Sequence, residues 1–272
     1  MKRSVDIAVI SDVHLGTFGC RATELLHYLK QIEPNTLILN GDIIDIWQFS
    51  KNYFPKSHMK VVRYILKMAM NGTKVVYITG NHDELLRKFV GMNFGNIELC
   101  NQYEVEVNGQ KTLFFHGDVF DLSIQHAKWL AKLGGKGYDV LILLNTFINF
   151  ISEKLGGKRV SLSKKIKNSV KQAVSFINNF EVAAAEYASK VNAHVVVCGH
   201  IHHPADKIIE TGTSSVRYLN SGDWIENLSA LEYHDGVWQT IQVNEVHDLD
   251  QQHSELEEPV AIALLKEFQL AK

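Results

Sequence analysis

The composition of this 272-residue chain, with 46% hydrophobic and 21% charged residues and a formal charge of -2, is typical of a soluble globular protein. The near-neutral charge gives no general attraction to nucleic acid, and no uninterrupted apolar run is long enough to span a bilayer. The three cysteines form no CxxC pair, and residues 1–4 lead directly into an apolar run, so we expect reduced thiols, no secretory signal and a cytoplasmic location.

The first eighty residues alternate between short apolar runs and amphipathic segments. The alternation predicts strands and helices in turn at residues 5–10, 22–32, 36–39, 56–70 and 74–79. This order is typical of a largely parallel sheet whose strands are joined by right-handed helical crossovers. Open sheets of this kind bind their ligands at the carboxyl ends of the strands.

The pattern changes after residue 96. Short strands are predicted at residues 97–99, 103–107, 112–115, 194–198, 216–219, 228–233 and 237–243. Between the third and fourth of these lies a helical stretch, residues 121–191, with eleven Lys and Arg against five Asp and Glu. We expect this stretch to form a cap inserted into a core of residues 1–120 and 192–243. Residues 244–272 form an acidic C-terminal tail.

Polar side chains that can bind a metal follow five of the predicted strands. Asp12 and His14 follow the first strand two residues apart, so the alternation of a strand would point both the same way. The other strand ends carry Asp42, Asn81 with His82, His116, and His200 with His202. For any single histidine a hydrogen-bonded core or loop position is the commoner role, but five such clusters together favour a metal site. Mixed oxygen and imidazole ligands suit Mn²⁺, Fe²⁺ or Zn²⁺ better than Ca²⁺ or Mg²⁺.

These residues also form five ordered motifs that resemble the signature of the calcineurin-like metallophosphoesterases. The motifs are Asp12-Val13-His14, Gly41-Asp42-Ile43-Ile44-Asp45, Gly80-Asn81-His82-Asp83, His116-Gly117-Asp118 and Gly199-His200-Ile201-His202. The resemblance covers residues 5–243. It implies an α/β (α+β) fold, namely a four-layer αββα sandwich with a helical cap insertion and a two-metal site between its sheets.

The same resemblance implies a role for each motif residue. One metal would be held by Asp12, His14, Asp42 and His202. The second would share Asp42 and be held also by Asn81, His116 and His200. His82 would lie beside the metals as an acid or electrostatic partner, and Asp45 would orient it.

Three features resemble one branch of that superfamily, the UDP-2,3-diacylglucosamine pyrophosphohydrolases of lipid A biosynthesis. They are the motif at residues 41–47, the helical insert after His116 and the motif at residues 218–224. The resemblance implies hydrolysis of a diphosphate bond to give lipid X (2,3-diacylglucosamine 1-phosphate) and UMP, usually with Mn²⁺. This chain departs from the branch at His82, where the characterised members carry Arg. The alternatives are a metal-dependent phosphodiesterase or phosphatase on another substrate, and a non-catalytic scaffold, which the complete ligand set disfavours.

The expected partners follow from this assignment and from the charge pattern. The apolar run at residues 140–151, followed by seven basic residues, suits either an acylated anionic substrate at the inner membrane surface or the core of the cap beside a solvated basic face. A nucleic-acid partner is not expected, because the basic stretch has few interleaved aromatic residues. The oligomeric state is not predicted. Four aromatic side chains could line a pocket, although a plain core position is the commoner role for each; they are Trp47, Phe49, Trp129 and Trp224.

Overall fold

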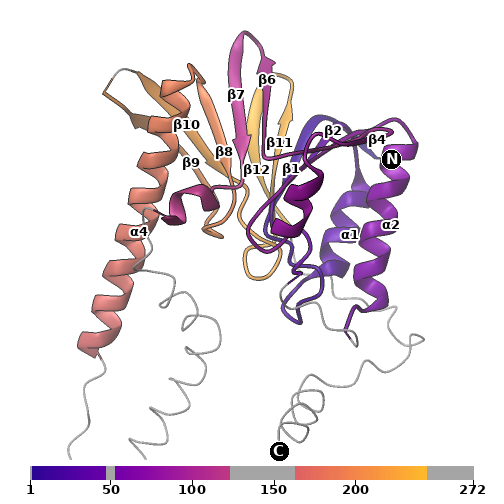
Figure 1. Cartoon of the computed structure of the whole chain (residues 1–272), viewed down its shortest axis with the longest axis horizontal. Helices are drawn as coiled ribbons and strands as arrows, with labels where there is room; N and C mark the ends of the chain where they lie inside the picture. Colours follow the sequence, from indigo (N-terminus) through magenta and orange to yellow (C-terminus); the bar gives the residue numbers. More distant parts are fainter. Residues whose placement is uncertain (1, 47–52, 123–162, 213, 244–272) are drawn as a thin grey trace, which may run out of the picture.

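Two β-sheets packed face to face form the centre of the computed structural model, which describes residues 2–46, 53–122, 163–212 and 214–243 (Figure 1). The first sheet has seven strands in the order β12-β11-β1-β2-β3-β5-β4, and the second has five in the order β6-β7-β8-β10-β9. Helices cover the outer faces of both sheets. The molecule is therefore a mixed α/β sandwich.

The strands and helices have the following bounds. The first sheet contains β1 (Arg3–Ile10), β2 (Ile32–Asn40), β3 (Lys74–Ile78), β4 (Asn93–Phe94), β5 (Ile97–Cys100), β11 (Ser229–His234) and β12 (Val237–Gln242). The second contains β6 (Gln102–Val107), β7 (Gln110–Phe115), β8 (Val195–Cys198), β9 (Ala205–Glu210) and β10 (Ser215–Asn220). The helices are α1 (Ala22–Gln31), α2 (Lys56–Met70) and α4 (Ser163–Lys190), with short 3₁₀ helices η1 (Glu84–Phe89) and η2 (Asp118–Leu122).

Parallel pairing brings the ends of the central strands to one level, as the sequence predicts. In the first sheet β1, β2, β3 and β5 are parallel neighbours, and Ile10 pairs with Leu39. In the second sheet β7, β8 and β10 are parallel, and Phe114 pairs with Val197. The loops that follow these strands carry the predicted site residues.

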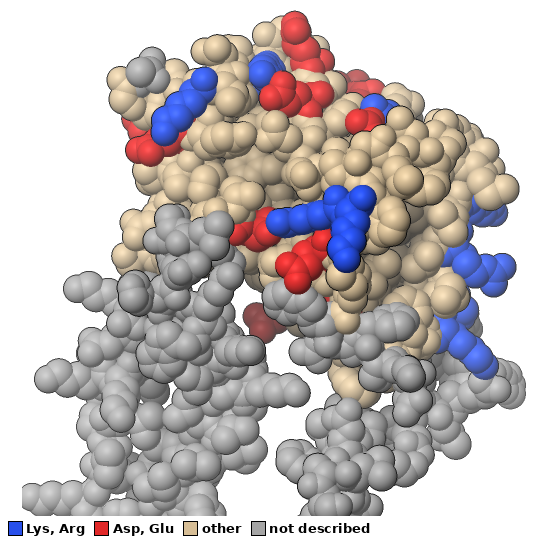
Figure 2. Space-filling view, viewed as in Figure 1, with Lys and Arg blue, Asp and Glu red and all other residues tan. Residues whose placement is uncertain are grey.

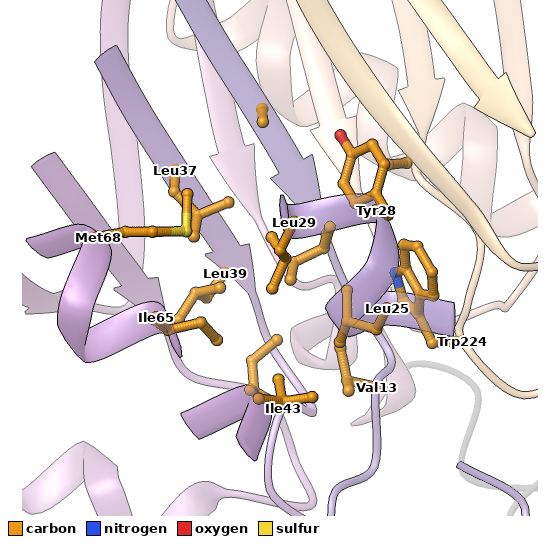
Figure 3. Close-up of a cluster of buried hydrophobic side chains, with 14 of the residues drawn as sticks. Val13, Leu25, Tyr28, Leu29, Leu37, Leu39, Ile43, Ile65, Met68 and Trp224 are labelled. Carbon is orange, nitrogen blue, oxygen red and sulfur yellow. The ribbon is translucent and has the colours of Figure 1, made fainter. Parts of the chain in front are cut away.

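Three buried clusters separate four layers. Because β1 is apolar on both faces, its side chains enter two of these clusters. On the outer face of the first sheet, Figure 3 shows side chains of α1 and α2 packing against β2; the labelled ones are Leu25, Leu29, Ile65, Met68, Leu37 and Leu39. Between the sheets, Val9 and Val76 face Phe114 and Val197.

The fourth layer is α4, which lies between β7 and β8 in the sequence. Its small side chains Ala184 and Ala188, together with Phe180, are buried against the second sheet. The layer order is therefore αββα, which confirms the predicted sandwich. Residues 123–162, including the apolar run at 140–151, lie outside the described part of the chain, so the extent of the cap stays a prediction.

Of the four aromatic side chains suggested for a pocket, only Trp224 lies among the described residues. It is fully buried, and its ring centroid is 5.5 Å from that of Tyr28, so Trp224 takes the core position that is the commoner role of such residues and does not line a surface pocket. Within the described residues, no helix is long and apolar enough to cross a membrane. The acidic tail at 244–272 also lies outside the described residues.

Candidate metal centre

Loops from both sheets meet where the predicted site residues lie. Asp12 and His14 follow β1, Asp42 and Asp45 follow β2, Asn81 and His82 follow β3, His116 follows β7, and His200 and His202 follow β8. Backbone hydrogen bonds fix the loops against one another. Asp12 N donates to Gly41 O at 3.1 Å, and Gly199 N donates to His116 O at 3.1 Å.

Five of these residues share an unusual backbone conformation. Their φ angles lie between 52° and 69°, and the residues are Asp12, His14, Asp42, His200 and His202. Only a few per cent of non-glycine residues adopt a positive φ. The conformation costs free energy, so it persists only where the surrounding structure enforces it, and such residues cluster at functional sites. Asp and His adopt this conformation more often than most residues, but its recurrence in five residues of neighbouring loops supports a single site.

The first cluster contains Asp12, His14 and His202, whose potential ligand atoms all lie within 4.8 Å of one another. His202 Nε2 is 3.3 Å from Asp12 Oδ1 and 3.4 Å from His14 Nε2. Burial lowers the pKa of His202, but the carboxylates of Asp12 and Asp223 outweigh it and raise that pKa to about 9. The negative charge of these carboxylates would also attract a metal cation.

The second cluster contains Asp42, His116 and His200, again within 4.8 Å. His116 Nε2 is 3.2 Å from Asp42 Oδ2, while His116 Nδ1 donates a hydrogen bond to Asn40 O at 2.9 Å. That second bond fixes the tautomer, so Nε2 faces the cluster as a potential ligand. Burial would raise the pKa of Asp42, but the neighbouring His116 outweighs it and holds that pKa well below its ordinary value.

Asn81 lies next to the second cluster. Both of its neighbours contact Asp42: His82 N donates to Asp42 Oδ1 at 2.8 Å, and a Cβ on Gly80 would lie 2.2 Å from the same oxygen. Asn81 Oδ1 is buried and has no hydrogen-bond partner among the described residues. A buried acceptor without a partner costs about 1–3 kcal/mol, a cost that a bound cation would remove. The oxygen and imidazole ligands present therefore fit a divalent metal such as Mn²⁺, Fe²⁺ or Zn²⁺.

His82 and Asp45 form the pair that the sequence predicts. His82 Nδ1 is 3.1 Å from Asp45 Oδ2, and Thr17 Oγ1 donates to the same oxygen at 3.1 Å. Burial lowers the pKa of His82, but the hydrogen bond to Asp45 and the charge of Asp42 outweigh it and raise that pKa. Asp45 Oδ2 is also 3.5 Å from His14 Nδ1, so it connects His82 with the first cluster.

Asp83, the last residue of its motif, has no role predicted from the sequence. Asp83 is fully buried, and its carboxylate accepts hydrogen bonds from Ile43 N at 3.0 Å, Tyr77 Oη at 2.7 Å and Gly80 N. These bonds join the loop after β2 to the loop after β3. Asp83 therefore holds Asp42 and Asn81 in register.

Asp223 is a second residue without a predicted role. Its Oδ2 is 3.5 Å from His202 Nδ1, and its Oδ1 accepts hydrogen bonds from the backbone amides of Ile225, Glu226 and Asn227. Asn227 Nδ2 donates to both Asp223 Oδ2 and His202 O, each at 2.8 Å. The carboxylate is thus fixed from three directions and orients the His202 ring with Nε2 towards Asp12.

We expect Asp223→Asn to weaken Mn²⁺ binding by about 10–100-fold, because carboxylates that orient a histidine ligand commonly contribute that much. The substituted amide keeps an oxygen for the backbone amides but loses the charge that faces His202. Isothermal titration of the metal-free protein with Mn²⁺ measures the effect. Asp206→Asn is the matched control, because Asp206 pairs with Arg217 on the surface. Equal Mn²⁺ affinity in all three proteins would contradict the role of Asp223.

Comparison with known proteins gives consistent matches. The family model for calcineurin-like phosphoesterases matches residues 5–204. UDP-2,3-diacylglucosamine hydrolase of Ectopseudomonas mendocina is 24% identical over 230 residues, covering 80% of this chain and 90% of that protein. The protein of the same name from Wigglesworthia glossinidia brevipalpis is 25% identical over 205 residues, covering 72% and 78%. Among solved structures, the phosphoesterase Yfce from E. coli is 15% identical with a TM-score of 0.42, covering 88% and 99%.

Proposed function

Because the chain belongs to the calcineurin-like phosphoesterase family, whose members are metal-dependent phosphoester hydrolases, we propose that it hydrolyses the diphosphate bond of UDP-2,3-diacylglucosamine. The products would be lipid X and UMP, in lipid A biosynthesis. The observation that carries the hydrolytic activity is the pair of ligand clusters formed at adjoining strand ends. The lipid substrate is supported by relatives of that name, which this chain matches along most of their length.

Seven residues would hold two divalent ions, most simply Mn²⁺. Asp12, His14 and His202 would bind one ion, Asn81, His116 and His200 the other, and Asp42 would bridge them. Bound in pairs about 3.5–4 Å apart, such ions lower the pKa of a coordinated water and stabilise negative charge on phosphate oxygens. The geometry of the metal-free residues supports this division, because these two clusters share no residue, and Asp42, which contacts His116 directly, also interacts electrostatically with His14 of the first cluster.

The remaining polar residues would act on the substrate without holding a metal. His82, whose protonated form is favoured by its contact with Asp45, would donate a proton or hydrogen bond to the oxygen that leaves phosphorus. Near His116 is a cavity of about 170 Å³ that is also lined by Arg87. Arg87 donates a hydrogen bond to Asp118, which orients the guanidinium at the edge of the metal centre. A cation there suits a substrate with a second phosphate group.

His82 supports a second candidate function. The residue is histidine here and arginine in the characterised UDP-2,3-diacylglucosamine hydrolases, which favours a metal-dependent phosphodiesterase or phosphatase acting on another substrate. Either enzyme would work in the cytoplasm, a location supported by the three cysteines, all of which are free thiols. For the lipid substrate the working place would be the cytoplasmic face of the inner membrane.

The decisive experiment compares UDP-2,3-diacylglucosamine with bis-p-nitrophenyl phosphate in the presence of Mn²⁺. We expect UMP release from the lipid with a kcat/KM at least about 100-fold above that of the diester, because binding of the remote nucleotide and acyl groups contributes to catalysis. Both activities should vanish with EDTA and return with Mn²⁺. Rapid hydrolysis of the diester without UMP release from the lipid would favour the second candidate function.

A further inference from the structure

The outer face of α2 carries a row of basic side chains. Lys56, Lys60, Arg63 and Lys67 are all exposed, and their spacing of four, three and four residues places them on one side of the helix. The helix has no Asp or Glu. Figure 2 shows blue side chains along the right-hand edge, where Figure 1 places α2, with no red side chains among them.

Exposed apolar side chains border this row. Met59 is 48% exposed, Leu66 46% and Met70 86%. Their spacing of seven and four residues places them together in a strip next to the basic side chains. The opposite side of α2, with Val61 and Ile65, is buried against the first sheet. The exposed apolar strip is thus separate from the apolar face of α2 that packs against the first sheet.

Three members of the basic row are not paired with acidic residues in the described part of the chain. Within the described residues, none of Lys60, Arg63 and Lys67 forms an ion pair, whereas basic residues elsewhere do, as in Lys111 with Glu104 and Lys207 with Glu181. Lys2 adds a further charge, since its Nζ lies 5.9 Å from the ring centroid of Tyr64 on α2. Within the part of the chain that the structure describes, the outer side of α2 is therefore a local positive surface, and no carboxylate pairs with Lys60, Arg63 or Lys67.

We propose that the outer face of α2 binds the surface of a bilayer that contains anionic lipids. The basic row would contact lipid phosphates, and Met59, Leu66 and Met70 would enter the boundary between headgroups and acyl chains. The apolar strip favours this partner over nucleic acid, which would leave the three side chains in water. The apolar strip also argues against a purely electrostatic contact with an acidic protein, which would not bury these three side chains.

The position of α2 gives this contact a consequence for the metal centre. His58, in the first turn of α2, accepts a hydrogen bond from Gly16 N at 2.9 Å, and Gly16 lies two residues beyond His14. The start of the basic row therefore adjoins a loop of the site. Binding of α2 to a membrane would bring the site close to an acylated substrate. This consequence rests on the proposed function, whereas the proposal that α2 binds lipid does not.

The test is sedimentation of the full chain with vesicles in the absence of substrate. The wild type should bind vesicles of 70% phosphatidylcholine and 30% phosphatidylglycerol, and binding to pure phosphatidylcholine should be at least about tenfold weaker. Lys60→Gln with Lys67→Gln should lower the partition coefficient on the anionic vesicles by about tenfold. The matched control is Lys111→Gln with Lys190→Gln, which removes the same charge from the second-sheet side and should bind as the wild type does.

A third variant, Met59→Ser with Met70→Ser, keeps the charge and should weaken vesicle binding several-fold. Equal binding by all variants, or no binding of the wild type to anionic vesicles, would overturn the proposal. So would binding to heparin that depends on Lys60 and Lys67 without any vesicle binding, because the partner would then be another polyanion. Hydrolysis of bis-p-nitrophenyl phosphate should be unchanged in every variant, so this test and that of the substrate fail independently.

Discussion

Replacing Asp42 by alanine is expected to abolish metal-dependent hydrolysis, lowering kcat for bis-p-nitrophenyl phosphate by about 10³-fold or more, equivalent to several kcal/mol of transition-state stabilisation. Asp42 is 2% exposed, lies 3.2 Å from His116 Nε2 and accepts a hydrogen bond from His82 N. It therefore connects loops from both sheets at the point where the bridging ligand is proposed. Its removal would also leave the buried His116 without its carboxylate partner.

Steady-state kinetics with increasing Mn²⁺, together with the metal content after gel filtration, measure the loss. Asp42→Asn tests the charge alone, because the amide has nearly the same volume, and it should lose most of the activity as well. Asp235→Ala is the control, since that carboxylate is 87% exposed and lies on a hairpin away from the site. A thermal melt of each variant separates lost chemistry from lost folding. Turnover like that of the wild type in Asp42→Ala would refute the two-metal assignment.

The site was predictable from the sequence to the extent that its residues follow strands directly. Asp12 comes two residues after β1, and His116 follows β7 immediately, so aligning the strand ends also aligns these side chains. Contacts made by packing between distant segments gave no such signal. Asp223 meets His202 only because the turn at residues 223–227 folds back onto the loop after β8. Likewise, Asp and His adopt positive φ angles more readily than most non-glycine residues, but residue type alone does not show which of them do so, because the loops impose that conformation on these five.

The bounds of the strands also depend partly on local sequence and partly on pairing with distant segments. The sequence predicts the second strand at residues 36–39, because Pro34 reads as a helix terminator, but β2 begins at Ile32. At Pro34 the strand pairs only with β1, since pairing with β3 begins at Thr36, so the missing N–H faces an unpaired side. The edge strand β9 was missed because most of its side chains are exposed and show no apolar alternation.

The outer side of α2 illustrates a limit of pattern reading. Its apolar spacing predicts the helix from the residues that face the sheet, Val61 and Ile65 among them. The same pattern treats every other position as solvated surface. Among the described residues, Lys60, Arg63 and Lys67 have no acidic partner. This depends on how the neighbouring elements pack around α2, which the order of residues along the chain does not show.

Replacing His82 by alanine is expected to lower kcat by about 10²–10⁴-fold, the usual contribution of a positioned acid, while Mn²⁺ binding stays close to that of the wild type. His82 Nδ1 contacts Asp45 Oδ2 at 3.1 Å, and the hydrogen bond to Asp45 and the charge of Asp42 raise the pKa of the imidazole, which favours its protonated form. Its backbone amide, which bonds Asp42, remains in the variant. The loss should therefore fall on the chemical step and not on metal affinity.

His82→Arg separates proton donation from charge. If the positive charge alone stabilises the leaving oxygen, arginine should restore most of the activity that alanine loses, because it keeps a cation in the same loop. If His82 must donate a proton, arginine should remain nearly as slow as alanine, since its pKa is too high for proton transfer. His27→Ala is the matched control, because His27 lies exposed on α1 and bonds only Gln31. Loss of bound Mn²⁺ in His82→Ala would instead make His82 a ligand, and the third group of possible ligand atoms, His14, Asp45 and His82, would then hold a metal of its own.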